Sequence, residues 1–240
     1  MNPRTLILPA LTLSVLLAAC SKTPRSAGAL PHEVYVWQRV WSPAVSGAVD
    51  EGKNDVARYA VLAAEIAGGE VARPAIDWAA LRNSGRPVAL VLRLGKNDID
   101  GQRAEIVTRL AMQLFGDAQE NGVTASELQI DYDCAESKLG GYRALLQKLR
   151  DTVPLTVTPT ALPSWLKQPE FAALARESGG FVLQVHSTSA PKLGVEKICS
   201  PSAARRWVGQ AGRLGVPFRV ALPTYRYLTA FDARGKFLGI

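Results

Sequence analysis

The 240-residue chain has few residues suited to metal binding or to the common nucleophilic mechanisms. It contains three cysteines and two histidines, His32 and His186, which are far apart in the sequence, and it has no CxxC pair. We therefore expect no metal site and no cofactor. The absence of a GxSxG segment argues against a Ser-His-Asp hydrolase. Residues 38–43, after the first expected strand, contain no glycine, whereas dinucleotide-binding folds place a glycine-rich phosphate loop there.

The basic residues are not arranged as a nucleic-acid-binding surface. The formal net charge is +7, but Lys and Arg are scattered apart from the pair Arg205 and Arg206. A nucleic-acid surface would show clustering and interleaved aromatic residues. The sequence thus predicts no nucleic-acid partner, and a solvated face or attraction to an anionic envelope surface explains the excess better.

The N-terminus has the pattern of a lipoprotein signal. Arg4 supplies a positive charge, Leu6 to Leu17 form an apolar segment, and Leu17-Ala18-Ala19-Cys20 matches a lipobox. The alternative is an ordinary signal peptide with a cysteine nearby by chance. A membrane-spanning helix would need a longer apolar run. The pattern predicts a signal peptide over residues 1–19, lipidation (including palmitate) of Cys20, a flexible tether over 20–32 and a single folded domain over 33–240.

Several acyl chains would hold the mature protein firmly on a membrane. Ser21 follows the cysteine, where bacterial lipoproteins retained at the inner membrane usually carry Asp. The sequence therefore favours a periplasm-facing protein anchored in the bacterial cell envelope, at the outer membrane in preference to the inner membrane. The oligomeric state is not specified.

Two further cysteines, Cys134 and Cys199, remain after lipidation of the first. An exported chain is exposed to oxidising conditions, in which an even pair can form a disulfide. Two free, half-buried thiols are the alternative. We favour the disulfide because both cysteines follow expected strand ends on the same side of the fold.

Strand and helix patterns alternate along the folded part. Helices are expected over 102–121, where Gly122 offers a C-terminal stop, over 138–150 and 163–177, and after Ser200, which can cap a helix that begins at Pro201. Apolar or alternating patterns predict strands over 34–39, 57–66, 87–94, 127–133, 153–160, 180–187 and 217–224. This alternation predicts a parallel sheet with helices outside it.

A closed barrel fits this alternation better than a doubly wound sheet. Polar side chains recur on one face near the carboxyl ends of several strands, where (β/α)8 barrel enzymes place their functional groups. One rim should collect Arg39, Glu65, Arg93, Asp131, Asp133, Gln184 and His186. After Tyr225 only a hairpin pattern over 227–231 and 236–240 remains. We therefore predict an α/β fold of the TIM-barrel type with an incomplete or irregular eighth unit.

Four segments together resemble one bacterial family. They are Leu128 to Asp133, Thr160 to Leu166, Val182 to His186 and Val220 to Tyr225. The combination resembles the DUF3142 family, uncharacterised lipoproteins with a glycoside-hydrolase-like barrel, from about Pro31 to the C-terminus. The resemblance implies a fold and a site, but no established reaction.

Chitinase-type barrels carry the pattern D-x-D-x-E at the end of the fourth strand, with the final Glu as the general acid. Here Asp131 and Asp133 are followed by Ala135 at the position of that acid, and Glu136 is one residue further on. A bulge could bring Glu136 back to the site, but substitution of the acid is the simpler interpretation. Substrate-assisted chitinase chemistry is therefore not expected.

Two carboxylates can still act as acid and base. In this hypothesis Asp133 is the acid or base, Asp131 tunes it by like-charge repulsion and holds it in place, and Glu65 is a third candidate. Arg39, Trp37, Arg93, Gln129, Gln184, His186 and Tyr225 would bind the sugar.

Each role has a structural alternative. Asp131 and Asp133 could instead form ion pairs with Arg39 or Arg93, and we give this interpretation equal weight. His186 could be a hydrogen-bonded barrel residue, and Trp37 could belong to the core. For Tyr225 a place in the core and a role in sugar binding have equal weight.

Two classes of function remain. The first is a glycoside-hydrolase-like lipoprotein that hydrolyses or modifies a carbohydrate. The second is a non-catalytic lipoprotein with a degenerate site that binds glycan or supports envelope assembly. Replacement of the chitinase acid by Ala135 favours the second.

Overall fold

The computed structural model describes residues 28–95, 99, 101–186, 198–225 and 229–239. The predicted signal peptide and the lipidation site Cys20 lie outside this range. Within it, no helix is long and apolar enough to cross a membrane.

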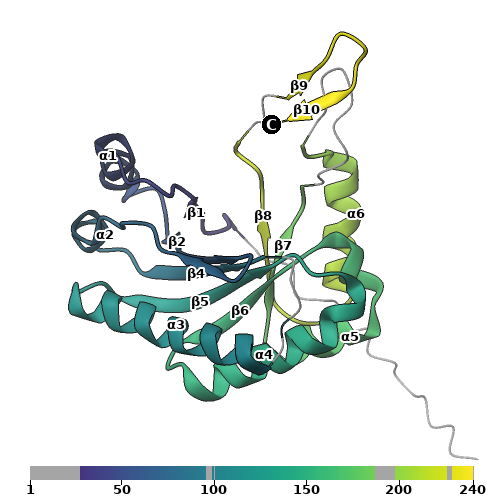
Figure 1. Ribbon diagram of the computed structural model, residues 1–240, viewed down its shortest axis with the longest axis horizontal. Helices are drawn as coiled ribbons and strands as arrows, with labels where there is room; N and C mark the ends of the chain where they lie inside the picture. The colour runs from purple at the N-terminus through teal and green to yellow at the C-terminus, as the bar shows by residue number, and fades with distance from the viewer. Residues whose placement is uncertain (1–27, 96–98, 100, 187–197, 226–228, 240) are drawn as a thin grey trace, which may run out of the picture.

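A parallel sheet forms the centre of the fold, in the order β1-β2-β4-β5-β6-β7-β8 (Figure 1). The short strand β3 pairs antiparallel with β2, and β9 and β10 form a separate antiparallel pair. The strand bounds are β1 (Glu33–Val36), β2 (Arg58–Ala67), β3 (Glu70–Ala72), β4 (Val88–Leu94), β5 (Ala125–Tyr132), β6 (Thr156–Ala161), β7 (Phe181–Gln184), β8 (Phe218–Ala221), β9 (Ala230–Phe231) and β10 (Phe237–Gly239).

A helix follows most strands and packs on the outer, convex face of the sheet (Figure 1). The helices are α1 (Pro43–Gly52), α2 (Trp78–Ser84), α3 (Gly101–Glu120), α4 (Leu139–Thr152), α5 (Pro169–Glu177) and α6 (Pro201–Gly212), with 3-10 turns η1 (Glu136–Lys138) and η2 (Pro163–Lys167). The expected α3 and α4 are confirmed. The expected helix 163–177 is divided into η2 and α5, and α1, α2 and β3 were not predicted.

Local sequence signals explain two helix ends. Ser200 accepts a hydrogen bond from the backbone N–H of Ala203, and α6 begins at Pro201, as expected from a capping serine before proline. After α3, Gly122 has a φ of +67°, a left-handed conformation that glycine adopts without steric cost.

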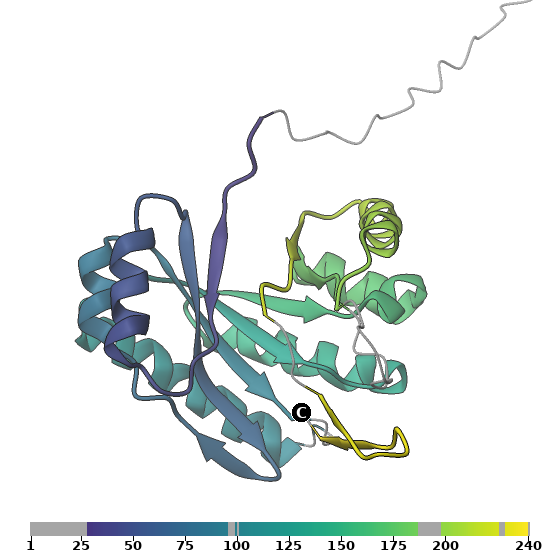
Figure 2. The ribbon, with the colours of Figure 1, turned by 90° about the horizontal axis from the view of Figure 1, so that it is seen from above.

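The sheet curls into a partial barrel of the predicted α/β barrel class. Among the described residues β1 pairs only with β2 and β8 only with β7, so these strands form the two edges. Figure 2 shows the sheet from above, with its two edges apart. The irregular eighth unit is confirmed in this respect, and β9 and β10 confirm the expected hairpin over residues 230–231 and 237–239.

Alternation along β5 separates the two faces of the sheet. Leu128, Ile130 and Tyr132 are buried in the core between sheet and helices. Glu127, Gln129 and Asp131 take the opposite parity and face the concave interior, where they are also buried. Alternating parity therefore directs a row of buried polar groups into the half-barrel.

A register irregularity in β2 corrects the predicted faces of that strand. Strict alternation along this strand would place Tyr59, Val61, Ala63 and Glu65 on one face. Tyr59, Val61 and Ala63 instead belong to the core beneath the helices, whereas Ala60 packs in the interior. The pairing with β4 shifts between Leu62 and Ala64, and this bulge reverses the parity, so that Glu65 pairs in register with Arg93.

Buried charges close the half-barrel at the amino ends of the strands. Glu127 of β5 forms ion pairs with Arg58 of β2 and Arg219 of β8. Glu33 of β1 lies 2.7 Å from the guanidinium of Arg58 and 3.4 Å from that of Arg219. Burial raises the pKa of Glu127, with Arg58 opposing the shift. The network thus joins the two edge strands that lack a backbone pairing with each other.

We predict that Glu127→Ala lowers the free energy of unfolding by about 3–5 kcal/mol, because it leaves two arginines without their buried partner. Urea unfolding monitored by circular dichroism measures the change. Glu105→Ala is the matched control, since this carboxylate forms an exposed pair with Lys148 on the outer helices, and its loss should cost less than about 1 kcal/mol. Equal effects of the two substitutions would contradict a closing role for the network.

Candidate functional site

Three charged residues form a row at the carboxyl ends of adjacent strands. Glu65 of β2 is in register with Arg93 of β4, and Arg93 is in register with Asp131 of β5. Parallel pairing places their side chains side by side on the concave face. The structure therefore brings these three predicted site residues together.

Asp131 is held on both of its oxygens. Oδ1 accepts hydrogen bonds from Thr160 Oγ1 at 2.8 Å and Gln184 Nε2 at 2.9 Å. Oδ2 lies 3.7 Å from Nε of Arg93. Burial, followed by the charge of Asp133, raises the pKa of Asp131 to about 6, and the contacts with Thr160, Arg93 and Gln184 oppose this rise. Asp131 is thus a fixed carboxyl group that exchanges its proton near neutral pH.

Glu65 is engaged by arginine. Its Oε2 accepts hydrogen bonds from Arg39 Nε at 2.9 Å and Nη2 at 2.7 Å. Its Oε1 lies 3.8 Å from Arg93 Nη1. Both oxygens of Glu65 are therefore directed toward arginine side chains. Of the ion pairs in the alternative interpretation, the structure contains the one between Arg93 and Asp131. The pairs of Glu65 with Arg39 and Arg93 were not part of that interpretation.

Asp133 differs from the other two carboxylates. It follows the end of β5 and is half-buried. Its Oδ1 is buried and has no hydrogen-bond partner among the described residues. The nearby carboxylate raises the pKa of His186, but desolvation outweighs it and lowers the value overall. His186 in turn contacts Tyr225 edge-to-face, with ring centroids 5.9 Å apart. Asp133, His186 and Tyr225 form one side of the rim.

Gln129 and Trp37 lie on the interior side of the same sheet. Tyr35 donates a 2.6 Å hydrogen bond from its hydroxyl to Oε1 of Gln129. The rings of Tyr35 and Trp37 stack with centroids 5.7 Å apart, and both pack against Ala60, Ala89 and Val91. Gln129 therefore supports the interior core and is further from the rim than Asp131.

Sequence reasoning did not identify the roles of Tyr35 and Thr160. Tyr35 orients Gln129, and burial raises its pKa far above the ordinary value. Thr160 belongs to a strand in which threonine is common for its β-propensity alone, but here it donates directly to Asp131. Both residues have the strand parity that directs the polar residues of the neighbouring strands into the interior, and this pattern could have identified them.

Glu136 does not replace the missing acid. It begins η1 and is exposed, and its carboxylate accepts a hydrogen bond from Gln168 at the start of α5. No bulge returns it to the strand face, since β5 ends at Tyr132. The interpretation that Ala135 replaces the chitinase-type acid agrees with this geometry.

The expected disulfide is absent from the structure. Cys134 and Cys199 are both free thiols. Cys134 is buried in the core beneath the helices, and Cys199 packs against that core from outside. Each sulfur is accommodated as a small apolar group, as free cysteines often are. Burial raises the pKa of Cys134 to about 11, which disfavours the reactive thiolate.

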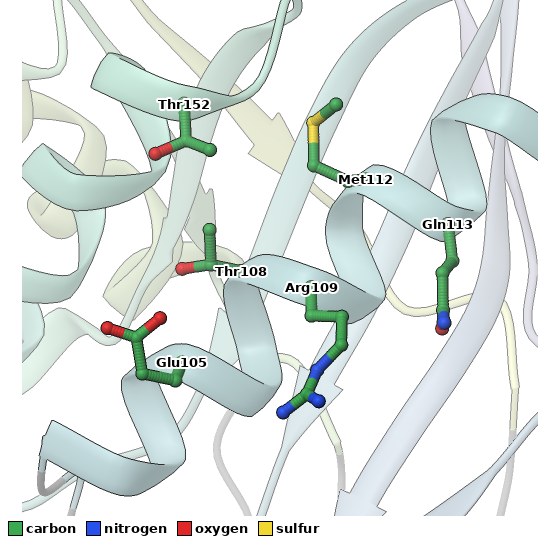
Figure 3. Close-up of a pocket in the computed structure, with 6 residues that line it drawn as sticks. All are labelled: Glu105, Thr108, Arg109, Met112, Gln113 and Thr152. Carbon is green, nitrogen blue, oxygen red and sulfur yellow. The ribbon is translucent and has the colours of Figure 1, made fainter.

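A hollow of about 590 Å³ lies elsewhere, on the outer surface along α3 and near the end of α4 (Figure 3). Glu105, Thr108, Arg109, Met112, Gln113 and Thr152 line it. The only carboxylate in this lining, Glu105, is paired with Lys148. Its lining contains none of the residues that the sequence predicts for the site, whereas the rim brings several of them together, so we assign the candidate site to the rim. No metal-binding group of three His, Cys, Asp or Glu occurs among the described residues.

Comparisons with known proteins agree with this architecture. The fold is similar to the Bacillus cereus spore cortex-lytic enzyme SleL, with a TM-score of 0.61 and 13% identity over 82% of this chain and 52% of that one. For the Bacillus megaterium spore cortex-lytic enzyme SleL the TM-score is 0.59 and the identity 12%, over 90% of this chain and 57% of that one. For the Chromobacterium violaceum chitinase the TM-score is 0.58 and the identity 14%, over 80% of this chain and 68% of that one.

The chain spans about half the length of the SleL enzymes. At these identities the likeness establishes a glycoside-hydrolase-like fold and nothing about activity. No curated protein sequence matches the chain. The model of a family described as a domain of unknown function, DUF3142, matches residues 84–238.

We predict that Asp131→Asn stabilises the protein at pH 7. A folded-state pKa raised from 3.8 to about 6 means that the charged form destabilises the fold. Wild-type stability attributable to this group therefore falls as pH rises between these values, by about 3 kcal/mol in all. Asparagine can still accept the bonds from Thr160 and Gln184.

Urea unfolding of wild type and variant at pH 4, 5, 6 and 7 tests this. The advantage of the variant should be largest at pH 7 and should disappear near pH 4. A variant less stable than wild type at pH 7 would show that pairing with Arg93 outweighs the cost of burial.

Proposed function

Because the chain belongs to the DUF3142 family of unknown function, its activity has to be argued from the site, and we propose that it binds a glycan at the rim and cleaves it with Asp133 as acid or base. The observation that carries this proposal is the buried Oδ1 of Asp133, which has no hydrogen-bond partner among the described residues. A buried polar atom without a partner is costly, and a substrate hydroxyl could donate a hydrogen bond to it.

The neighbouring groups fit this role. Asp131 is two residues away, so its Cβ and that of Asp133 are separated by roughly 6.5 Å along an extended chain. Carboxyl groups about 5–9.5 Å apart occur in retaining and inverting glycosidases. Asp131, fixed by Thr160 and Gln184, would position and tune Asp133 through its charge. His186 and Tyr225 present polar and aromatic surfaces beside it.

The proposal is consistent with the fold. Structures named as a chitinase and as spore cortex-lytic enzymes share it, and barrel enzymes assemble their sites at the carboxyl ends of the strands. The absence of a chitinase-type acid at Ala135 means that a shared fold does not transfer the reaction.

A second candidate is a glycan-binding protein without turnover. The pairing of Glu65 with Arg39 favours it, because one oxygen of this third candidate carboxylate already accepts two hydrogen bonds within the protein. Asp133 would then accept a hydrogen bond from a sugar hydroxyl. Both candidates place the ligand in the same position and differ only in whether a bond is broken.

We expect Asp133→Asn to reduce glycan cleavage by at least about 100-fold, the range in which general acid-base groups contribute, with binding changed much less. Release of reducing ends from a panel of envelope and matrix glycans measures turnover, and calorimetry measures binding. Asp151→Asn on the outer surface of α4 is the control. Cleavage unchanged by Asp133→Asn would remove the assigned role, and binding without cleavage by wild type would establish the second candidate.

We also propose that the protein is held on the envelope by acyl chains on Cys20, facing the periplasm and at the outer membrane in preference to the inner. The support is the sequence Leu17-Ala18-Ala19-Cys20, followed by Ser21. An anchored barrel would act on glycans within reach of a tether of about a dozen residues.

Cys20→Ala should abolish incorporation of radiolabelled palmitate and move the protein from the membrane fraction to the soluble fraction. Ser21→Asp keeps the acylated cysteine and should shift the protein toward the inner membrane on a density gradient. Labelling that persists in Cys20→Ala would refute the lipidation site.

A further inference from the structure

Arg93 lies at the centre of the rim, between Glu65 and Asp131. Its side chain is 43% exposed, although it stands between two carboxylates. The nearest oxygens, on Glu65 and Asp131, lie 3.8 and 3.7 Å away, beyond hydrogen-bond distance. No hydrogen bond joins its guanidinium to a described residue. The two carboxylates therefore hold the cation in place and leave its donors available.

Arg39 adds a second cation at the same edge. Its Nε and Nη2 both donate to one oxygen of Glu65, and the side chain is 61% exposed. Glu65 thus links the two guanidinium groups, because its other oxygen faces Arg93. A planar guanidinium that still has free N–H groups matches the geometry of a carboxylate better than that of a neutral hydroxyl.

The remaining side of the rim has the opposite requirement. Asp133 presents a buried oxygen that needs a donor, and the His186 and Tyr225 rings lie on the same side. A sugar unit with hydroxyl groups toward Asp133 and an acid group toward Arg93 would satisfy both sides together. A neutral sugar could accept a hydrogen bond from Arg93 but would offer no opposite charge to its guanidinium.

We propose that the glycan bound at this rim is acidic and that Arg93, assisted by Arg39, binds the carboxylate of a sugar residue. This inference rests on the proposed glycan-binding function and narrows its substrate to carboxylate-bearing sugars. Glu65 and Asp131 repel an incoming anion, and the two arginines offset that repulsion. Burial of Asp131 reduces its own contribution, since its pKa of about 6 lowers its charge in mildly acidic solution.

Matched pairs of oligosaccharides test the proposal. Each pair consists of an acidic oligosaccharide, containing uronic acid, sialic acid or a lactyl ether, and its carboxyl-reduced neutral counterpart of the same length. We expect wild type to bind the acidic member of at least one pair ten-fold or more tightly by calorimetry. Added salt should weaken that binding more than binding of the neutral member.

Three variants separate direct binding from general effects. Arg93→Gln should lower affinity for the acidic member by at least about ten-fold and abolish its preference over the neutral member. Arg93→Lys keeps the charge but loses the planar fork, so it should retain only part of the preference. Arg109→Gln, on the outer surface of α3, should change neither affinity. Thermal unfolding of each variant confirms that it is folded.

The failures are distinguishable. Equal affinity for both members of every pair that binds would overturn the acidic-glycan inference and leave the proposed glycan function standing. A preference that survives Arg93→Gln unchanged would overturn the role of Arg93. If no member of any pair binds, the proposed function itself fails, and this inference fails with it.

Discussion

Carboxylates that point into the curled sheet must be neutralised or hydrogen-bonded, and this constraint organises the interior. A buried charge without a partner is far more costly than any single apolar contact is favourable. At the amino ends of the strands Glu127 is matched by Arg58 and Arg219. At the carboxyl ends Asp131 is matched by Thr160, Gln184 and Arg93. Strands from every part of the sheet contribute to these two layers, so the charges define how far the sheet curls.

The same constraint compensates for the open edge. Backbone pairing between β1 and β8 is absent among the described residues, yet Arg219 of β8 reaches Glu33 of β1 and Glu127 of β5. A long side chain with a fixed charge can span a gap that backbone hydrogen bonds cannot. The charges at the amino ends of the strands therefore hold the two edges in place. The polar groups at the carboxyl ends can then keep some hydrogen-bonding capacity for a ligand.

The sequence predicted most of the architecture because alternation of apolar and polar residues is a local signal. Parity along β5 correctly placed Gln129 and Asp131 on one face, and Gly122 and Ser200 marked helix ends. Parity failed in β2, where the bulge between Leu62 and Ala64 reverses the faces, because a bulge depends on pairing with β4 and leaves no local pattern. The lower charge layer was also missed, since Glu33 and Arg219 are distant in sequence and only the curl brings them together. The prediction of a disulfide was wrong for a related reason. Cys134 is buried in the core by the packing of the helices, which a local sequence pattern does not reveal.

The site differs from a chitinase in a specific physical way. With Ala135 at the acid position and Glu136 bonded to Gln168 outside the barrel, the rim has lost a proton donor. It has two partly exposed guanidinium groups, those of Arg39 and Arg93, and that of Arg93 has no hydrogen-bond partner among the described residues. Proton transfer would therefore fall to Asp133, the one rim carboxylate with an oxygen lacking a partner among the described residues, while recognition would fall to the arginines. On this proposal the group that transfers a proton and the groups that recognise the ligand lie on different sides of the same rim.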